Sequence, residues 1–383
     1  MKVLKMGMVG GASGAFIGEV HRKAARMDGG VEFVAGAFSS DPARSRAQAE
    51  PLAIAPERCY ASWQEMLAAE AALPKAVRID FVSICTPNAQ HYPVAKAFLE
   101  AGFDVMCEKP MTMTVEEAED LKRVVKKTGR VFGLLHTYTG YPMAKLARDM
   151  VKQGDIGKVR KVVVRYPQGW LGSFAQGNPI AKSWRTQPKA AGASCCMGDI
   201  GVHAANLAEF VTGLKIDKVL ADLSSYLKGP LDDDGNVLLR FKGGAKGVLT
   251  ATQVGPGEEN NLHIHVYGEK KSIEWFQENP NYLRLLADTE PEQVWKRGNA
   301  YVAAKSPAAG RATRTPCGHP ESLIEAFANH YRNFCDTIRA RLAKRKPTEL
   351  ELDFPNVEDG VRGMRFIAAT VESSKKGNVW VKC

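Results

Sequence analysis

The sequence lacks the cysteine spacings that mark a disulfide scaffold or a structural zinc site. None of its eight cysteines, at positions 59, 85, 107, 195, 196, 317, 335 and 383, belongs to a Cys-x-x-Cys pair. A chain of 383 residues can also bury enough surface to fold without disulfide bonds. We therefore expect reduced thiols, as in a cytosolic protein.

Long apolar runs are missing as well. No segment approaches the ~18 consecutive apolar residues of a membrane span. The apolar stretch at the amino terminus reaches glycine at residue 10, too early for a signal peptide, and there is no twin arginine. These absences predict a soluble, cytoplasmic protein with no membrane partner.

The chain carries no zinc-finger or RNA-binding signature to accompany its positive charge, which is +10 from 52 basic and 42 acidic residues. The basic residues lie mostly in helical patterns, for example at residues 122–127 and 339–346. Solvated helix faces explain such patterns. We expect no nucleic-acid partner.

What the chain does have is an ordinary globular composition, with 45% hydrophobic and 25% charged residues. Its length exceeds the roughly 250 to 300 residues at which a single core stops growing. We therefore expect two domains, formed by residues 1–137 and residues 138–383.

The first half alternates short apolar strands with helical patterns. Strands are expected at residues 3–9, 32–38, 79–86, 103–107 and 131–135. Strands and helices alternating at this spacing predict an α/β fold with a parallel, doubly wound sheet of the Rossmann type. Ligands of such sheets bind at the carboxyl ends of the strands.

A glycine-rich turn, Gly-Gly-Ala-Ser-Gly at residues 10–14, separates the first strand from the first helix. Glycines let the backbone approach a pyrophosphate, and the start of a helix offers N–H groups to it. The spacing departs from Gly-x-Gly-x-x-Gly, because Ala12 stands where a second glycine is usual and Gly18 lies further on. From this motif alone, a phosphate cradle and a structural turn are both open.

The second strand ends in Ser39-Ser40-Asp41-Pro42, with Arg44 close behind. A dinucleotide fold places the group that contacts the adenine ribose at this strand end. Asp41 is more simply explained as the N-cap of a helix that begins at Pro42. Serines beside an arginine tolerate a 2′-phosphate, so the kind of dinucleotide stays open.

The strand at residues 103–107 ends in Glu108-Lys109-Pro110. Pro110 cannot donate to a sheet and biases Lys109 toward an extended conformation, so the strand stops and the lysine faces the ligand side. A partly desolvated lysine beside a cationic ring can pass protons to a substrate hydroxyl. An exposed loop lysine is the alternative.

The pattern changes after residue 137. Alternating segments are expected to form strands at residues 160–166, 219–226, 235–241, 247–253, 263–268 and 272–275. Short turns between them predict an α+β domain with a large, mostly antiparallel sheet that carries helices on one face. The open face of such a sheet is a natural oligomer interface, although a solvated face is also possible.

One helix of the second half, expected at residues 198–206, carries Asp199 and His203 on one face. A carboxylate and a histidine one turn apart can share a substrate, and the histidine can move a proton near neutral pH. Alternatively, His203 packs in the core, and Asp199 is an acidic residue that stabilises the start of the helix. Two ligands without a third make a poor zinc site, so no metal is expected.

Other residues give weaker signals. His21 and the pair Cys195-Cys196 are expected to pack in the interior. Loops at residues 170–189 and 299–319 are expected to carry substrate specificity. Three histidines are weaker candidates for the ligand side: His91, His136 and His319. Three rings could stack on a sugar ring, although packing is their commoner use: Tyr166, Trp170 and Trp184.

Five motifs together resemble the Gfo/Idh/MocA oxidoreductases, a family that includes glucose-fructose oxidoreductase and inositol dehydrogenase. The motifs are Gly18-x-x-His21, Thr86-Pro87-Asn88-x-x-His91, Cys107-Glu108-Lys109-Pro110, Gly154-Asp155-Ile156-Gly157-Lys158 and Gly198-Asp199-Ile200-Gly201-x-His203. They extend over nearly the whole chain in a fixed order. The motifs around Lys109 and His203 are highly specific in combination.

The resemblance implies an amino-terminal Rossmann domain that binds NAD or NADP, and a carboxyl-terminal domain whose sheet forms a homodimer or homotetramer. It implies a carbohydrate or cyclitol as the substrate. Lys109 and His203 would be the acid/base pair, and Asp199 would orient the substrate. The cofactor would be contacted by Gly10, Gly11, Ala12, Ser13, Phe16, Ile17, Ser39, Ser40, Arg44, Thr86, Pro87, Asn88, His91, Glu108 and Lys109.

Three functions are compatible with this resemblance. The favoured hypothesis is a dehydrogenase that moves a hydride from a substrate carbinol to the nicotinamide, while His203 removes the hydroxyl proton and Lys109 stabilises the alkoxide. An alternative is a glycosidase-like enzyme that oxidises its substrate only transiently. Another is a non-catalytic nucleotide-binding regulator, against which the intact Lys109, Asp199 and His203 argue.

Overall fold

The chain folds into two units in the computed structural model, which describes residues 2–174 and 183–383. The first unit comprises Met1–Thr112, Glu116–Thr137 and Leu323–Val361, and the second comprises Met113–Val115, Tyr138–Ser322 and Arg362–Cys383. This arrangement differs from a single division at residue 137, because Leu323–Val361 packs with the first unit.

The first unit is built on a five-stranded sheet in the order β2-β1-β3-β4-β5, and every neighbouring pair is parallel. The strands are β1 (Leu4–Gly10), β2 (Val31–Ala37), β3 (Phe81–Cys85), β4 (Asp104–Glu108) and β5 (Phe132–Leu135). Every residue of β3, β4 and β5 is buried, so both faces of the sheet are covered. The expected parallel Rossmann sheet is confirmed.

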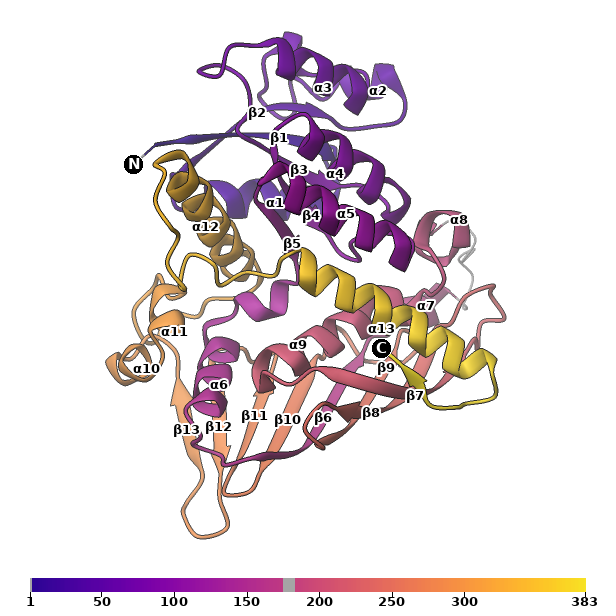
Figure 1. Cartoon of the computed structure of the whole chain (residues 1–383), viewed down its shortest axis with the longest axis vertical. Helices are drawn as coiled ribbons and strands as arrows, with labels where there is room; N and C mark the ends of the chain where they lie inside the picture. The colour runs from indigo at the N-terminus through magenta and orange to yellow at the C-terminus, as the bar shows by residue number, and fades with distance from the viewer. Residues whose placement is uncertain (1, 175–182) are drawn as a thin grey trace. The chain divides into compact units, whose positions relative to one another are not determined.

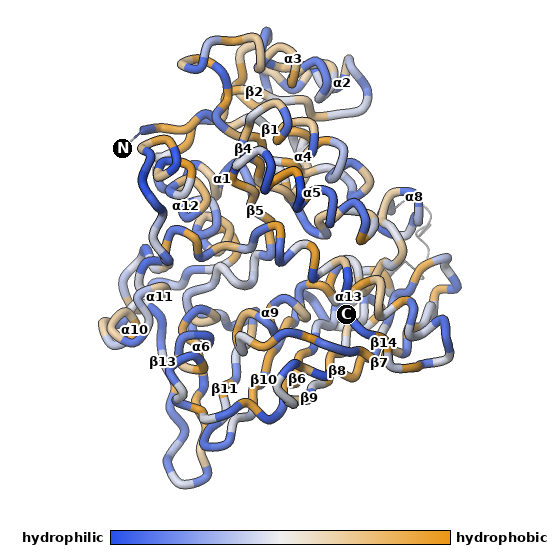
Figure 2. The backbone as a smooth tube through the Cα atoms, in the orientation of Figure 1, coloured by the Kyte–Doolittle hydropathy of each residue, from blue (hydrophilic) through white to orange (hydrophobic). Residues whose placement is uncertain are grey.

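Helices cover this sheet on both faces. In Figure 1, α4 (His91–Glu100) and α5 (Val115–Thr128) lie in front of the strands, and α1 (Phe16–Arg26) lies behind them. Figure 2 shows hydrophilic residues along the outer turns of α5, as a surface helix requires. The shorter elements of this unit are α2 (Pro42–Arg46), η1 (Pro56–Arg58), α3 (Trp63–Ala72) and η2 (Asn88–Gln90).

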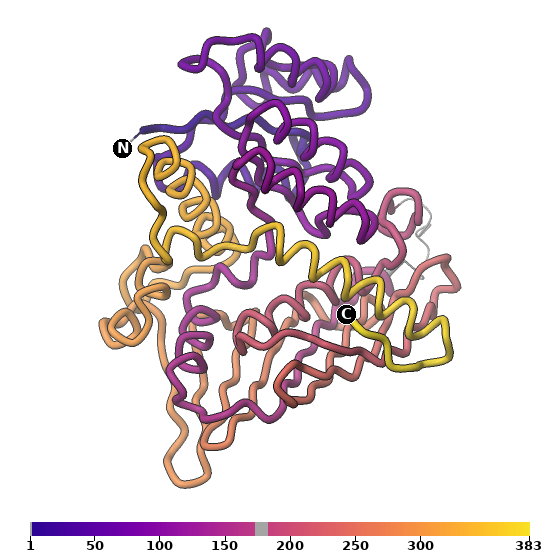
Figure 3. The backbone as a smooth tube through the Cα atoms, in the orientation of Figure 1, coloured from indigo at the N-terminus to yellow at the C-terminus, as the bar shows by residue number. Residues whose placement is uncertain are grey.

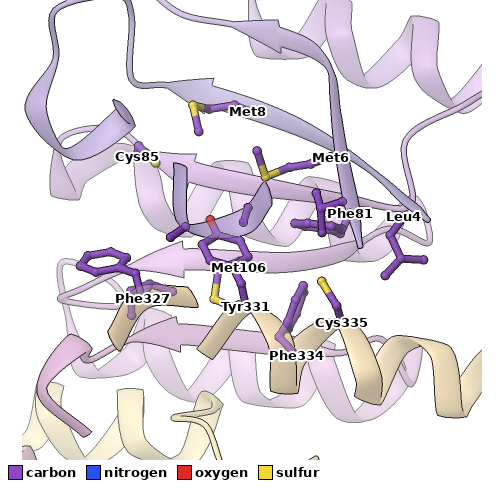
Figure 4. Packing of buried hydrophobic residues seen from close by; sticks show 14 of the residues in the cluster. Leu4, Met6, Met8, Phe81, Cys85, Met106, Phe327, Tyr331, Phe334 and Cys335 are labelled. Carbon is purple, nitrogen blue, oxygen red and sulfur yellow. The ribbon is translucent and has the colours of Figure 1, made fainter. Parts of the chain in front are cut away.

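The chain returns to the first unit with α12 (Leu323–Leu342), which lies beside the amino-terminal elements in Figure 3. Its buried residues Phe327, Tyr331 and Phe334 are three or four positions apart, so they form one apolar stripe. The ring of Phe334 meets that of Phe81 edge to face, with the ring centroids 5.3 Å apart. Figure 4 shows both rings within the buried cluster. This stripe is the physical reason why the segment belongs to the first unit.

Two arginines near the end of α12 do not form the solvated face expected for residues 339–346. Arg339 donates to the backbone carbonyl of Gly30 at 2.7 Å. Arg341 pairs with the buried carboxylate of Asp104. Part of the positive charge of this segment therefore stabilises the packing of the first unit.

The second unit contains a nine-stranded sheet in the order β13-β12-β11-β10-β6-β9-β8-β7-β14. Its neighbours are antiparallel except for β6 and β9, which are parallel. The bounds are β6 (Val159–Pro167), β7 (Ile216–Ser224), β8 (Asp234–Phe241), β9 (Lys246–Thr252), β10 (His263–Gly268), β11 (Ser272–Phe276), β12 (Tyr282–Leu286), β13 (Gln293–Lys296) and β14 (Val381–Lys382). The expected mostly antiparallel sheet is confirmed, and β12, β13 and β14 are additional to the six expected strands.

Helices cover one face of this sheet. α6 (Pro142–Lys152) packs on β11 and β12, and α9 (Val202–Thr212) packs on β6 and β10. The strands alternate buried residues on this face with more exposed residues on the other, for example in β8 and β10. We call the second face the outer face.

The remaining elements are shorter, apart from the last helix. They are η3 (Thr137–Gly140), α7 (Trp170–Phe174), η5 (Trp184–Thr186), α8 (Pro188–Ala191), the π-helical turn η6 (Met197–Gly201), α10 (Ala300–Lys305), α11 (Pro307–Arg311) and α13 (Val357–Lys375). No helix within residues 2–174 and 183–383 combines the length and apolarity needed to cross a membrane. The eight cysteines are all unpaired.

Candidate active site

The order of the five-stranded sheet places the ends of β1 and β3 side by side, at the point where the strand order reverses. Gly10, the last residue of β1, is in register with Cys85, the last residue of β3. Doubly wound sheets bind their ligands at this reversal, beyond the carboxyl ends of the strands. The residues that follow Gly10 and Cys85 are therefore the first candidates for contacts with a nucleotide.

The turn after β1 depends on glycine. Gly10 and Gly11 have φ angles of +79° and +68°, in the left-handed region. A Cβ atom on Gly18 of α1 would lie 2.4 Å from the Cα atom of Gly11, so only glycine lets the helix come this close to the turn. The side chain of Ala15 provides no cap to the first N–H groups of α1. A helix start of this kind is suited to phosphate.

Arg22 holds this turn from the interior. Its guanidinium donates to the backbone carbonyl of Gly11 and contacts the sulfur of Met8 at 3.5 Å. On the outer side of the turn, the N–H group of Ser13 donates to Gln48 Oε1 at 2.7 Å. The conformation of the glycine turn is therefore supported by side chains from two later segments.

Thr86, directly after β3, has a buried hydroxyl oxygen for which the described part of the chain provides no hydrogen-bond partner. A Cβ atom on Gly10 would lie 3.1 Å from the methyl carbon of Thr86, so this residue adjoins the glycine turn. A buried polar atom without a partner costs about 1–3 kcal/mol, and a ligand that bonds to it removes this penalty. The glycine turn, the start of α1 and Thr86 together fit a dinucleotide.

The end of β2 carries the polar residues expected near the adenine ribose. The carboxylate of Asp41 accepts from the N–H group of Arg44 at 3.1 Å and caps α2, so the expected N-cap is confirmed. Ser39 Oγ accepts from the N–H group of Asp41 at 3.1 Å. Ser40 and Arg44 are exposed. The carboxylate of Asp41 is therefore used to cap α2. Ser40 and Arg44 are the exposed polar side chains that follow β2.

Lys109 follows directly after β4 and is half-buried. Both carboxylate oxygens of the preceding Glu108 are engaged within the unit: Oε1 lies 2.9 Å from His21 Nε2, and Oε2 accepts from the N–H group of Lys109 at 3.1 Å. His21 Nδ1 lies 2.6 Å from the Tyr331 hydroxyl, which lies 2.8 Å from Ser83 Oγ. This network connects the turn at Lys109 to α1 and α12.

The charges in this network stabilise one another. Burial alone would lower the pKa of His21, but Cys85, Tyr331 and the Glu108 carboxylate raise that pKa well above its usual value. Burial alone would raise the pKa of Glu108, but the bond from His21 lowers it overall. Burial raises the pKa of Tyr331 to about 12. At neutral pH an imidazolium therefore faces a carboxylate, and Tyr331 keeps its hydroxyl proton.

His91, a predicted cofactor contact, has both ring nitrogens turned to backbone carbonyls. Nδ1 lies 2.7 Å from the carbonyl of Pro110, and Nε2 lies 3.0 Å from that of Thr86. Burial lowers the pKa of His91, so at neutral pH the ring has one proton and donates to one of these carbonyls. His91 thus connects the ends of β3 and β4.

The other predicted cofactor contacts surround the glycine turn and the end of β3. Ala12 and Ile17 are half-buried, and Asn88 is buried. The exposed members are Ser13, Phe16 and Pro87. The ring of Phe16, at 70% exposure, lies at the start of α1 with little packing inside the unit, which suits a side chain that covers a ligand.

In the second unit, Asp199 lies in the π-helical turn Met197–Gly201 that precedes α9. The regular helix expected over residues 198–206 is therefore wrong for its first turn. π-helical turns occur frequently at functional sites. The carboxylate oxygen Oδ2 of Asp199 accepts from Gln253 Nε2 at 2.9 Å and lies 3.4 Å from Arg185 Nε.

His203, in the first turn of α9, is only 7% exposed. Its ring packs edge-on against Tyr138, with ring centroids 4.9 Å apart, and lies 6.4 Å from Tyr166. The two tyrosine hydroxyls bond to each other, and Asn260 bonds to both, at 2.6 Å from Tyr166 and 3.2 Å from Tyr138. Burial, Tyr138 and the charge of Asp199 raise the pKa of Tyr166. The ring of His203 therefore lies beside both tyrosines, and the charge of Asp199 acts on Tyr166.

The remaining candidates have other surroundings. Lys109 belongs to the first unit, whereas Asp199 and His203 belong to the second. Tyr166, a weaker candidate for stacking on a sugar whose commoner use would be packing, is buried at 2% exposure, and the Arg185 guanidinium lies over the Trp184 ring. Trp170 is half-buried, His136 is buried and His319 is exposed. Residues 175–182 of the expected specificity loop lie outside the described residues.

Four residues that support the candidate residues within their own units were not expected from the sequence: Arg22 and Tyr331 in the first unit, and Arg185 and Gln253 in the second. Each reaches its partner from another element, and three of them have no motif around them. Arg22 follows directly after His21 in the Gly18-x-x-His21 motif, which was the one available signal. No group of three or more His, Cys, Asp or Glu side chains in the described residues is arranged to hold a metal ion.

Two family models match the chain. Residues 4–136 match the model described as an oxidoreductase family with an NAD-binding Rossmann fold. Residues 144–274 match the GFO/IDH/MocA C-terminal domain. Together the two matches cover more than half of the chain.

Curated relatives also align with this chain. The uncharacterized oxidoreductase YfiI of Bacillus subtilis (strain 168) is 34% identical over 387 residues, which cover 100% of this chain and 97% of that protein. The levoglucosan dehydrogenase of Pseudarthrobacter phenanthrenivorans is 30% identical over 244 residues, which cover 57% of this chain and 60% of that protein.

Solved structures with similar folds include an inositol dehydrogenase homologue from Azotobacter vinelandii complexed with NAD+. It has a TM-score of 0.92 and 34% sequence identity over 100% of this chain and 98% of that chain. A structure of an inositol dehydrogenase homologue from the same organism, complexed with NADH and myo-inositol, has a TM-score of 0.89 at 34% identity, with the same coverage.

Proposed function

Because this chain belongs to the Gfo/Idh/MocA family of oxidoreductases, with an NAD-binding Rossmann domain, we propose that it interconverts a secondary hydroxyl and a ketone on a sugar, glycoside or cyclitol, with NAD as the cofactor. One observation carries the proposal. The glycine turn, Lys109 and the Asp199–His203 segment occur in one chain that aligns end to end with a relative crystallised with NADH and myo-inositol. The levoglucosan dehydrogenase relative supports the same substrate class.

The chain's own contribution to cofactor binding is position and charge. A bound nicotinamide supplies the hydride acceptor of the reaction. The glycine turn and the N–H groups at the start of α1 would hold the pyrophosphate, and the hydroxyl of Thr86 would gain a hydrogen-bond partner. Arg22 keeps the glycine turn closed by binding the Gly11 carbonyl. Ser40 and Arg44, which are both exposed, would contact the adenine ribose.

Lys109 and His203 are the proposed acid/base pair. The imidazole of His203 takes the hydroxyl proton of the substrate, and the ammonium of Lys109 stabilises the negative charge that develops on its oxygen. The carboxylate of Asp199 accepts a hydrogen bond from a neighbouring hydroxyl and so orients the ring. Cyclic polyols with adjacent hydroxyls provide both of the groups that these proposed roles require.

The direct test follows the absorbance of reduced nicotinamide when the purified protein is mixed with NAD or NADP and a panel of myo-inositol, levoglucosan and methyl glucoside. We expect NADH to form with at least one compound, and NAD to be preferred over NADP. Cleavage of methyl glucoside without net NADH would instead support the redox-neutral glycosidase. Saturable NADH binding without turnover of any compound would support a non-catalytic regulator.

The acid/base roles make a separate prediction. Lys109→Ala and His203→Ala are each expected to lower kcat by about 10²- to 10⁴-fold, because a positioned proton-transfer group contributes that much. NADH affinity, measured by fluorescence titration, should change little. Lys96→Ala is the control, because Lys96 of α4 forms a partly exposed ion pair with Asp120 of α5. Wild-type turnover in both active-site variants would remove these residues from the mechanism.

We further propose that the protein acts in the cytoplasm as a homodimer or homotetramer. The eight unpaired cysteines fit a reducing compartment. The outer face of the nine-stranded sheet, which the helices α6 and α9 leave uncovered, fits a second copy of the chain.

A further inference from the structure

Gln253 occupies a fixed place beside Asp199. It directly follows β9, and its side chain is completely buried. Its backbone N–H group donates to the Asp233 carbonyl at 2.8 Å, and its own carbonyl accepts from the N–H group of Leu171 at 3.0 Å. These backbone bonds leave the side chain of Gln253 little freedom to move relative to the sheet.

The two ends of the Gln253 amide have different partners in the same short segment. Nε2 donates to Asp199 Oδ2 at 2.9 Å, and Oε1 accepts from the thiol of Cys195 at 3.3 Å. A side-chain amide can turn end over end, so its orientation depends on which neighbour donates. Burial and the charges of Asp199 and Asp232 raise the pKa of Cys195, so this thiol keeps its proton and acts as a donor.

The segment that carries both partners is itself held by a buried carboxylate. Asp232 accepts from Ser194 Oγ at 2.9 Å and from the backbone N–H groups of Cys195 at 3.1 Å and Met197 at 2.9 Å. The start of the π-helical turn is therefore anchored, and Cys195 and Asp199 are held at a set spacing. Gln253, which follows β9, bonds to both of these residues.

We propose that Gln253 is a positioning residue for the proposed reaction, which aims the Asp199 carboxylate at the substrate, and that the thiol of Cys195 sets the direction of the Gln253 amide. The inference rests on the proposed substrate-orienting role of Asp199. It assigns a purpose to Cys195 beyond packing. Arg185, 3.4 Å from the same carboxylate oxygen, supplies positive charge but is partly exposed and less tightly held.

The decisive variant is Gln253→Glu. It keeps the shape of the side chain and replaces the donated N–H group with a second carboxylate next to Asp199. At alkaline pH the two carboxylates repel each other, and at acidic pH they can share one proton and restore the contact. We expect kcat/KM for myo-inositol, or for the panel compound that turns over fastest, to fall about 10- to 100-fold at alkaline pH, which corresponds to one lost hydrogen bond to a charged group. The loss should shrink toward acidic pH.

Gln277→Glu is the matched control. Gln277 is also a buried glutamine that directly follows a strand of the same sheet, β11, and its Nε2 donates to Tyr141 rather than to Asp199. We expect this variant to keep the wild-type pH profile of kcat/KM. Thermal melting of both variants shows whether each is folded, and NADH titration should give the wild-type affinity for both.

The role of Cys195 is tested by Cys195→Ser and Cys195→Ala. Serine keeps a donor, so kcat/KM should stay within a few-fold of wild type, whereas alanine should lower it further. The infrared S–H stretching band of Cys195, isolated as the difference between wild type and Cys195→Ser, gives a measure that needs no turnover. A hydrogen-bonded band that becomes weaker in Gln253→Ala supports the orientation.

Two results would overturn the inference: a folded Gln253→Glu variant with the wild-type kcat/KM at every pH, or the same pH dependence in Gln277→Glu. A wild-type protein that turns over no compound of the panel contradicts the proposed function instead. In that case the infrared band still decides whether Cys195 donates to Gln253, so the two failures are distinguishable.

Discussion

The ion pair of His21 and Glu108 shows how single residues prepare the end of β4. The exposed fractions of their side chains are 0% and 11%, so either charge alone would be strongly destabilising. Tyr331 bonds to the second nitrogen of the imidazole, and the N–H group of Lys109 bonds to the second carboxylate oxygen. Replacing one member therefore leaves a buried charge without its partner, next to a proposed catalytic lysine.

We expect Glu108→Gln to lower the free energy of unfolding by about 3 to 5 kcal/mol, with a defined pH dependence. The pKa of His21 is raised above its usual 6.5, so its contribution is complete below that pH and is lost as the pH rises through the folded pKa. The pKa of Glu108 is lowered from its usual 4.5, so its contribution is complete above that pH and is lost as the pH falls through the folded pKa. The difference from wild type should be largest between these two values.

Urea unfolding across this pH range measures the difference. Glu65→Gln is the control, because Glu65 pairs with Arg46 at 2.8 Å on the surface, with side chains 40% and 56% exposed. Such a pair contributes less than about 1 kcal/mol. A stability difference for Glu108→Gln that stays the same at every pH would contradict the ion pair.

At the scale of elements, the contact between the glycine turn and α1 determines whether the phosphate site forms. Gly18→Ala places a Cβ atom 2.4 Å from the Cα atom of Gly11, and both are backbone positions that cannot move apart cheaply. We expect the variant to lose about 1–3 kcal/mol of stability, as overpacked sites do. Displacement of α1 should weaken NADH binding by at least about tenfold.

Gly14→Ala is the matched control in the same turn. A Cβ atom there meets nothing within 4 Å, so only the left-handed φ of +79° opposes the substitution. Fluorescence titration with NADH compares the two variants. Equal affinities for NADH in Gly14→Ala and Gly18→Ala would show that the close approach of α1 is not what shapes the site.

At the scale of the whole molecule, the outer face of the nine-stranded sheet is the proposed contact between copies. The strand register aligns Leu238, Val248, Val163 and His265 in one row across four strands. Leu238 is 42% exposed, and Tyr267 and Tyr282 on the same face are 37% and 41% exposed. Three of the four residues in this row are apolar, and exposed apolar residues grouped in this way are typical of a surface that another subunit covers.

We expect Leu238→Asp to dissociate the oligomer, because an unpaired charge in an interface costs about 2–5 kcal/mol, or roughly 30- to 4,000-fold in affinity. Light scattering combined with size-exclusion chromatography measures the mass. Leu352→Asp, at a residue of the first unit that is 49% exposed, is the control and should keep the wild-type mass. A monomeric wild-type protein would contradict the proposed assembly.

Local patterns predicted several parts of the structure correctly because their causes are local. Continuous apolar runs predicted the buried strands β3 and β4, and the cap of α2 by Asp41 involves only four consecutive residues, 41–44. Other parts gave no local signal. The short strands β12 and β13 follow no long apolar run, and the π-helical turn at Asp199 arises where Asp232, a distant residue, binds the backbone.

The sequence by itself determined the parallel sheet with its glycine turn and the antiparallel sheet, and it singled out Lys109, Asp199 and His203 as candidates, because alternation, glycine geometry and motif spacing are properties of short segments. Only the tertiary structure decided which residues surround them. His21 and Tyr331 are separated by 310 positions, and Asp199 and Gln253 by 54. Contacts at such separations depend on how helices pack on sheets, and no pattern along the chain encodes the buried hydrogen bonds that result.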